Sequence, residues 1–263
     1  MRGAVPIRTS EAFIIDVRKL QEADRLVVFF TEDEGKISGV AKSAARSRRR
    51  FGGKLERLSR VRATWFDKEG RELCRVDSCD LLEESFSLHQ DLRRAALLPY
   101  IAEMVNTFGR EREADARYYR LLRSVIAALR AGGDPRTLAR YFEVWTLRLH
   151  GLLPELDRCV SCQRDLSASG GSLMLGDTPG IFCRACRAET THEDAGWGGV
   201  IRLGPEAMSL LATFRTTSPG ALSADLSGHG ALATVGGAME KMMTGFVGHP
   251  FRSRRFLREV EGA

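Results

Sequence analysis

Two β-strands joined by a tight turn are predicted by residues 25–42, which read RLVVFFTEDEGKISGVAK. The first half is rich in the β-branched and aromatic residues that favour strands, and residues 37–41 return to that pattern. Between the two strands, Asp33, Glu34 and Gly35 supply the polar and glycine residues that turns require. We therefore expect a hairpin here, and the flanking sequence indicates what sheet it belongs to.

Three further strands are expected around this hairpin. They alternate apolar with polar residues and cover residues 12–15, 60–66 and 72–82. Five short strands within residues 11–84 are typical of a small antiparallel barrel. A barrel also needs residues that allow its strands to bend, and the glycines at suitable positions are Gly35, Gly39, Gly52 and Gly53.

Downstream of the strands the apolar residues recur at spacings of three and four, which indicates helices. Ser87 and Gln90 resemble a capping box that would begin the first helix. Further helices are expected over residues 114–131, 134–150, 205–214 and 231–247. Gly236 and Gly237 weaken the last of these predictions, because glycine disfavours helix interiors.

These patterns give an α+β chain with several domains. We expect a β-barrel at residues 1–84 and a helical domain formed by residues 85–150 and 192–263. A cysteine-containing module at residues 151–191 would be inserted into the helical domain. The size of 263 residues, with 43% hydrophobic and 28% charged residues, fits an ordinary globular protein and excludes wholesale disorder.

The chain has no apolar segment of the kind that directs secretion or spans a membrane. We therefore expect a cytoplasmic protein without membrane association. Six cysteines are too sparse for a disulfide scaffold, and the cytosol would keep them reduced. Cys74 and Cys79 are interpreted as small apolar residues of a strand.

The other four cysteines form two pairs with ribbon spacing, Cys159-x-x-Cys162 and Cys183-x-x-Cys186, separated by twenty residues. Each pair can direct two thiolates from one turn toward the same ion, so the segment predicts one tetrahedral zinc site. Four cysteines fill the coordination sphere, which indicates a structural ion. His192 could replace one ligand, but a solvated loop residue is the favoured interpretation.

The module has little apolar sequence of its own. Residues 173–175 and 181–182 are expected to pair as a short hairpin between the two cysteine pairs. Because so few apolar residues are available, we expect metal binding to supply most of the folding free energy of this segment.

Positive charge is concentrated in residues 36–62, which hold ten basic residues and the single acid Glu56. The segment has a net charge of +9, whereas the whole chain has +6 and its remainder therefore −3. A basic loop between two strands cannot bury these charges and is suited to phosphate backbones. The residues that we predict to bind DNA are Lys36, Lys42, Arg46, Arg48, Arg49, Arg50, Lys54 and Arg57.

Aromatic residues near the basic segment could stack on bases, although a place in the barrel core is the favoured interpretation for them. They are Phe51, Trp65 and Phe66. A weaker basic group near the C-terminus could extend the DNA surface or only solvate a terminal helix. Its members are Arg252, Arg254, Arg255 and Arg258.

Several stretches of the chain resemble the bacterial RecO recombination mediators. In the N-terminal part these are EADR at residues 22–25, TEDEGKISGVAK at 31–42 and RFGGKL at 50–55. Around the cysteines they are YFE at 141–143, LHGLLP at 149–154, DRC at 157–159 and GIFC at 180–183. The resemblance covers nearly the whole chain and is weakest after residue 200.

The resemblance implies an N-terminal OB-fold, a helical domain and an inserted zinc module. It also implies a protein of DNA recombination, repair and the response to DNA damage, present at the nucleoid during repair. Members bind single- and double-stranded DNA and anneal complementary strands. With RecR, and sometimes RecF, they load RecA onto DNA coated by single-strand-binding protein (SSB), whose acidic C-terminal tail binds their helical domain. Residues 42–45 depart from the glycine-bearing turn expected of the family.

Two other functions remain open from the residues alone. A zinc-dependent enzyme acting on nucleic acid is the less favoured, because the sequence contains neither H-E-x-x-H nor a G-x-x-x-x-G-K-[ST] phosphate loop. A zinc-ribbon interaction protein of transcription or translation is the other. The favoured reading is a DNA-binding mediator that is not an enzyme.

Overall fold

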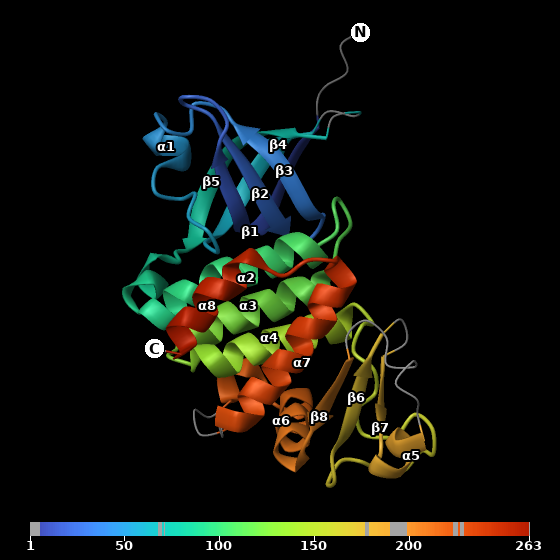
Figure 1. The fold of residues 1–263 in the computed structure, drawn as a ribbon. Helices are drawn as coiled ribbons and strands as arrows, with labels where there is room; N and C mark the ends of the chain where they lie inside the picture. Colours follow the sequence, from blue (N-terminus) through green and yellow to red (C-terminus); the bar gives the residue numbers. More distant parts are fainter. Residues whose placement is uncertain are drawn as a thin grey trace. The chain divides into compact units, whose positions relative to one another are not determined.

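The structure is a computed structural model that describes residues 6–67, 70, 72–176, 179–189, 199–222, 226 and 229–262. The chain divides into two compact units (Figure 1). The first consists of residues 1–120 and 252–263, and the second of residues 121–251. The sequence analysis divided the chain into a barrel, a helical domain and a cysteine-containing module. That three-part division stays a prediction.

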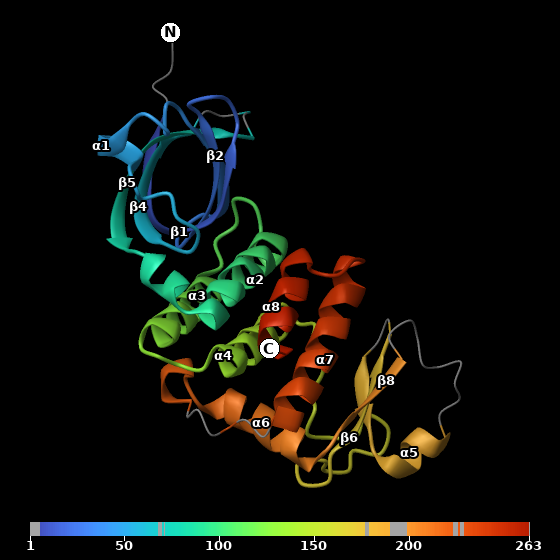
Figure 2. The ribbon, with the colours of Figure 1, turned by 60° about the vertical axis from the view of Figure 1, so that its left-hand side comes forward.

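A closed five-stranded barrel forms the N-terminal part of the first unit, and Figure 2 looks into it. Its order is β1-β2-β3-β5-β4, with β3 and β5 parallel and the other neighbours antiparallel. The strands are β1 (Ile7–Lys19), β2 (Arg25–Thr31), β3 (Gly35–Ala41), β4 (Arg60–Phe66) and β5 (Cys74–Glu83). This arrangement is OB-like and confirms the predicted barrel and its five strands, but the expectation that all strands are antiparallel was wrong, because β3 and β5 close the barrel as a parallel pair.

Alternating side chains of the strands fill the inside of the barrel. Ala12, Ile14, Val27, Phe29 and Ile37 belong to one buried core cluster. Phe13 and Phe30 lie outside that cluster and are still fully buried. Their rings pack against two tyrosines at the start of α3 (Ala116–Arg130), with Phe13 to Tyr119 at 5.5 Å and Phe30 to Tyr118 at 5.6 Å between centroids.

The tip of the predicted hairpin docks onto the segment between α2 (Leu92–Phe108) and α3. The backbone N–H of Lys36 donates to the Arg110 carbonyl at 2.9 Å, and the N–H of Arg112 donates to the Lys36 carbonyl at 3.0 Å. Gly35 sits at this junction with φ +68°. A Cβ on Gly35 would lie 2.0 Å from the Glu113 carbonyl oxygen, so only glycine fits there without backbone movement.

The first helix does not begin at the predicted capping box. Residues 86–90 form the short 3-10 helix η1, and α2 starts at Leu92. The side chain of Asp91 accepts a hydrogen bond from the Arg94 N–H and is therefore the N-cap. The predicted helix start at Ser87 was wrong, because Asp91, directly before α2, accepts a hydrogen bond from an N–H group at the start of the helix.

Helix α8 (Arg252–Gly262) closes the first unit by packing along α2 (Figure 1). The backbone N–H groups of Arg252 and Ser253 donate to the Glu103 carboxylate at 3.0 and 2.9 Å. The apolar residues Leu257 and Val260 are buried. The end of the chain is thus an integral part of this unit.

The second unit combines helices with a small sheet. Its helical elements are residues 121–130 of α3, α4 (Pro135–Leu149), α5 (Arg184–Glu189), α6 (Pro205–Thr216), the 3-10 helix η3 (Pro219–Ala221) and α7 (His229–Val247). The antiparallel sheet has the order β7-β6-β8, formed by β6 (Gly171–Leu175), β7 (Gly180–Phe182) and β8 (Gly199–Leu203). The predicted hairpin is β6 with β7, whereas β8 was not expected.

One glycine of the pair that weakened the prediction of α7, Gly236, has a packing role. Helices α4 and α7 lie side by side, and α4 carries a buried ion pair between Arg140 and Glu143 at 2.8 Å. A Cβ at Gly236 would lie 2.2 Å from Nη1 of Arg140. Gly236 therefore leaves room for the buried guanidinium, and this contact outweighs the low helix propensity of glycine. Among the described helices, none is both long and apolar enough to cross a bilayer.

Replacing Gly35 with alanine should destabilise the protein by more than about 2 kcal/mol, because a left-handed backbone costs about 1–2 kcal/mol outside glycine and overpacking adds about 1–3. Urea denaturation measures the free energy of unfolding. Gly53→Ala is the matched control, since Gly53 has φ +65° but no atom within 4 Å of its added Cβ. Equal losses in the two variants would contradict the docking of the hairpin tip.

Candidate nucleic-acid interface and metal centre

The basic loop, residues 42–51, leaves the barrel directly after β3 and ends in α1 (Arg48–Phe51). Its first turn is fixed by Asp24, whose Oδ1 accepts the Ser43 N–H at 2.8 Å. The N–H groups of Arg46 and Ser47 donate to the Ser43 carbonyl. Ser43 has φ 55°, in the left-handed region that favours glycine. The turn thus keeps the conformation of a glycine-bearing turn although this chain has serine there.

Three cations of the basic loop are free to meet a ligand. Lys42, Arg48 and Arg49 are exposed and form no ion pair within the described part of the chain. Arg46 is also exposed and pairs with Glu22 at 3.1 Å, with side chains 70% and 87% accessible. Such an exposed pair contributes little and is readily exchanged for a phosphate.

Arg50 of the same loop is arranged differently. Its guanidinium donates to the carbonyls of Lys42 at 2.9 Å and Asp77 at 3.4 Å, and to Ser47 Oγ at 3.1 Å. It also lies 5.0 Å from the centroid of the Phe51 ring. The side chain is therefore directed at the protein and only partly exposed.

The remaining predicted DNA-binding residues are held by groups of the protein itself. Arg57 pairs with Asp16 at 3.0 Å. Lys54 donates to the Arg49 carbonyl at 3.1 Å and lies 3.7 Å from Asp80.

Lys36 lies apart from the other predicted residues. It donates to the Asn106 carbonyl at 2.7 Å and pairs with Glu111 at 3.4 Å. Lys36 precedes Lys42 by six residues in the direction of β3. At a rise of 3.3 Å per residue, the two residues are about 20 Å apart. The structure thus brings Lys42, Arg46, Arg48 and Arg49 together and places Lys36 elsewhere.

The aromatic residues near the loop belong mainly to the barrel. Phe51 and Trp65 are 2% and 1% exposed and lie in the core cluster, so bases cannot reach them. Phe66 is half-buried beneath the Arg75 guanidinium, 4.3 Å from its ring centroid.

The basic group near the C-terminus consists partly of packed residues. Arg254 is buried, lies 5.3 Å from the Tyr100 ring centroid and pairs with Glu261 at 3.6 Å. Arg255 is exposed and lies 3.7 Å from Glu259. Arg254 therefore stabilises the packing of α8 and is not available as a surface cation.

The four predicted ligands converge in the second unit. The sulfurs of Cys159, Cys162, Cys183 and Cys186 all lie within 4.8 Å of one another, so these residues can bind a metal ion. A thiolate-bound ion at about 2.3 Å from each sulfur needs sulfurs about 3.8 Å apart in a tetrahedron. The Sγ atoms of Cys162 and Cys183 are 3.8 Å apart. His192 lies outside the described residues.

Backbone N–H groups prepare these sulfurs for an ion. Burial raises the pKa of Cys159, but the N–H groups of Cys162, Cys183 and Ser161 stabilise its thiolate and bring the pKa down to about 6. The N–H of Cys186 lowers the pKa of Cys183. The thiolate is the form that binds metal, so the backbone favours the ligating state of Cys159 and Cys183. For Cys186, a hydrogen bond with Ser161 lowers the pKa, but interactions with the Cys183 and Cys162 sulfurs outweigh it and raise the pKa to about 12. By contrast, burial raises the pKa of both Cys74 and Cys79 to about 12, as fits apolar strand residues.

The sheet fixes the two cysteine turns relative to each other. The Val160 N–H donates to the Ile181 carbonyl at 3.0 Å, and the Cys183 N–H donates to Cys159 Sγ at 3.3 Å. Leu173 and Ile181 pair across β6 and β7 and are fully buried. The first turn is thus bound directly to the strand that leads into the second.

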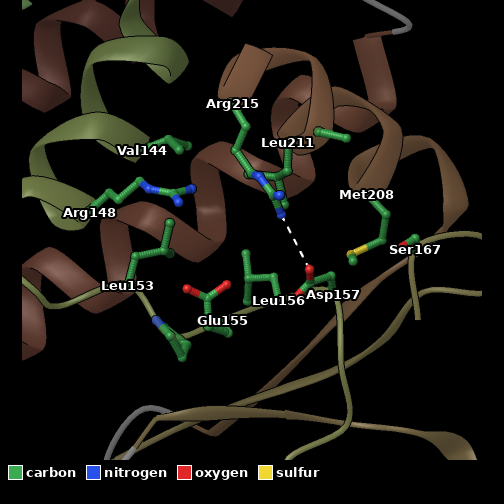
Figure 3. Close-up of a pocket in the computed structure, with 12 residues that line it drawn as sticks. Val144, Arg148, Leu153, Glu155, Leu156, Asp157, Ser167, Met208, Leu211 and Arg215 are labelled. Carbon is green, nitrogen blue, oxygen red and sulfur yellow. Dashed lines mark ion pairs between the residues drawn. The ribbon is translucent and has the colours of Figure 1, made fainter. Parts of the chain in front are cut away.

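A pocket between α4, α6 and the segment after α4 is a further candidate site (Figure 3). Figure 3 shows the guanidinium groups of Arg148 and Arg215 reaching toward it, with Arg215 paired to Asp157 at 3.5 Å. Its apolar lining consists of Val144, Leu153, Pro154, Leu156, Met208, Leu211 and Ala212. We call it the α4–α6 pocket, and the sequence analysis did not find it.

Known proteins carry the same two parts in the same order. The family model described as Recombination protein O N terminal matches residues 5–85, and the one described as Recombination protein O C terminal matches residues 89–215. The chain belongs to the RecO family. The first RecO match covers the barrel with the basic loop, and the second covers the cysteine cluster and the α4–α6 pocket.

Individual RecO proteins agree with this assignment. The DNA repair protein RecO of Anaeromyxobacter sp. (strain Fw109-5) is 31% identical over 243 residues, 91% of each chain. The DNA repair protein RecO of Geobacter metallireducens is 30% identical over 252 residues, 96% of this chain and 97% of that protein. The DNA repair protein RecO of Koribacter versatilis is 43% identical over 160 residues, 61% of this chain and 65% of that protein.

Thiol reactivity tests the division of the six cysteines. In metal-replete protein at pH 8, we expect a thiol reagent to find no rapidly reacting group, because four sulfurs bind the ion and Cys74 and Cys79 are buried and protonated. A strong chelator should release four reactive thiols, and denaturant the last two. Four thiols that react freely in protein shown by elemental analysis to be purified without metal would contradict the site.

Proposed function

We propose that this RecO-family protein is a recombination mediator in DNA repair that binds single- and double-stranded DNA and anneals complementary strands. The observation that carries the proposal is the set of exposed, unneutralised cations at Lys42, Arg48 and Arg49, with Arg46 beside them. Each phosphate contacted by such a cation releases condensed counterions, and this release drives binding. Arg50, Lys54, Arg57 and Lys36 hold the loop or the barrel in place through their bonds to the protein.

Annealing follows from the same electrostatics. Two complementary strands repel each other through their phosphates, and a cationic surface that binds both lowers that repulsion. Base pairing then supplies the free energy, so nucleotide hydrolysis is not needed. The proposed activity is therefore not enzymatic.

The ion of the cysteine site is proposed to be one structural zinc. Four thiolates complete its preferred tetrahedron and leave no position for water or substrate. Its role is to hold the turns at Cys159 and Cys183 together beneath the small sheet. Because the three strands have only three to five residues each, loss of the ion should unfold this part of the second unit.

The α4–α6 pocket is proposed to receive the acidic C-terminal tail of SSB. Arg148 and Arg215 offer donors for carboxylates, and the apolar lining accepts a hydrophobic side chain. Asp157 already pairs with Arg215, so an arriving carboxylate would compete with it. RecR, and in some circumstances RecF, are the further proposed partners in loading RecA, in the cytoplasm and at the nucleoid during repair.

Changing Lys42, Arg48 and Arg49 together to alanine should weaken binding to single-stranded DNA and lower the magnitude of its salt slope by about 2, since each lost contact removes about 0.7. Fluorescence anisotropy over a range of salt concentrations measures both quantities. The control replaces Arg8, Arg18 and Arg110, which are exposed but paired with carboxylates, and changes the net charge equally. If the loop variant behaves like the control, the loop is not the DNA site.

Arg215→Ala should lower the affinity for an acidic peptide with a free C-terminus by about tenfold to a hundredfold, because a charge-assisted hydrogen bond contributes about 1.5–3 kcal/mol. Calorimetric titration with the free peptide and with its C-terminal amide gives the comparison. Arg123→Ala, at an exposed position of α3, is the control and should leave the affinity unchanged. Equal binding by the Arg215→Ala variant and the unmodified protein would rule out the α4–α6 pocket.

A further inference from the structure

We propose that Arg50 is a positioning residue that fixes the backbone of the basic loop and is not one of the phosphate contacts. The inference rests on the proposed DNA-binding function of that loop and divides its arginines into two roles. Arg48 and Arg49 present charge to solvent, whereas Arg50 determines where that charge is presented.

The hydrogen bonds of Arg50 connect three separate parts of the first unit. Nη2 donates to the Lys42 carbonyl at the start of the basic loop, and Nε donates to Ser47 Oγ at the entrance to α1. Nη1 reaches the Asp77 carbonyl in β5. One planar side chain thus joins both ends of the loop to a strand of the barrel.

The loop needs such a connection because its local structure is weak. Helix α1 has four residues, far fewer than an isolated helix needs for stability. Ser47 makes no side-chain capping bond to this helix, since its hydroxyl accepts from Arg50 instead. Ser43 adds the cost of a left-handed backbone. Tertiary contacts must therefore hold the loop. Asp24 and the Ala23 carbonyl bind its first turn, Phe51 packs in the barrel core, and Arg50 connects the start of the loop to α1.

The hydrogen bonds of Arg50 also leave few of its N–H donors for a ligand. Three of its N–H donors are directed at protein oxygens, and its guanidinium lies against the Phe51 ring, which is 2% exposed. All three acceptors are uncharged, so these bonds fix the orientation of Arg50 without neutralising its charge. Only two of its five N–H donors remain, and a side-on bidentate phosphate contact through Nε and Nη2 would require breaking bonds that order the loop.

Lysine substitution separates positioning from charge, because lysine keeps the charge but cannot reproduce the planar set of donors. We expect Arg50→Lys and Arg50→Ala to weaken the binding of single-stranded DNA about equally. The affinity should fall by roughly fivefold to tenfold, a loss of about 1–1.4 kcal/mol in binding free energy. For Arg50→Lys the salt slope should stay unchanged, because every charge of the loop remains. Arg49→Lys should retain its affinity for single-stranded DNA. Arg49→Ala should bind more weakly, and the magnitude of its salt slope should fall by about 0.7.

Hydrogen exchange provides a readout that does not involve DNA. The backbone N–H groups of Ser47 and Phe51 are hydrogen-bonded within the loop, and their exchange should accelerate in both Arg50 variants and stay unchanged in both Arg49 variants. Ser47→Ala removes one acceptor without changing any charge. It should accelerate the same exchange to a smaller extent, and it serves as the test if Arg50→Ala does not fold.

Two results would overturn the inference. One is full DNA affinity in Arg50→Lys together with a slope loss of about 0.7 in Arg50→Ala, which is the behaviour of a phosphate contact. The other is unchanged loop exchange in both Arg50 variants. Failure of the proposed function looks different, because the Arg49 variants would then bind DNA normally while the exchange of the loop still accelerated in the Arg50 variants.

Discussion

The short parallel pairing of β3 with β5 is the constraint on which the barrel and the basic loop proposed to bind DNA depend. Gly39, Val40 and Ala41 pair with residues 74–76 and close the barrel. Closure leaves no free strand edge and fixes the point at which the chain leaves β3, one residue before the basic loop. A Cβ at Gly39 would lie 2.5 Å from Cys74 Sγ, so the close approach of the two strands requires glycine.

Most secondary structure could be predicted from the sequence because its signals are local. The alternation in β2 and β3, and the Asp134-Pro135 start of α4, need no information from the rest of the chain. The helix start at Leu92 and the tolerance of Gly236 in α7 could not be predicted in this way. The first depends on which of two nearby caps is used, and the second on a buried guanidinium in another helix.

The candidate sites show the same difference. The cysteine cluster was predictable because two CxxC turns already direct paired sulfurs, and the fold only has to bring the turns together. The eight predicted DNA-binding residues could not be divided by sequence, since the carboxylates near Arg57, Lys54 and Lys36 come from distant segments. The α4–α6 pocket has no sequence signal, because its wall forms only when α6 packs near the segment after α4.

The acceptors around Arg50 are uncharged, so the bonds by which it is proposed to order the basic loop do not depend on how many exposed cations the loop carries. Backbone carbonyls and a hydroxyl are unaffected by ionic strength or by substitutions at Lys42, Arg48 and Arg49. If the loop binds DNA as proposed, its affinity can therefore be tuned by exchanging surface side chains, while the backbone beneath them is preserved. Strong retention and rapid release of a strand become adjustable properties of a single architecture.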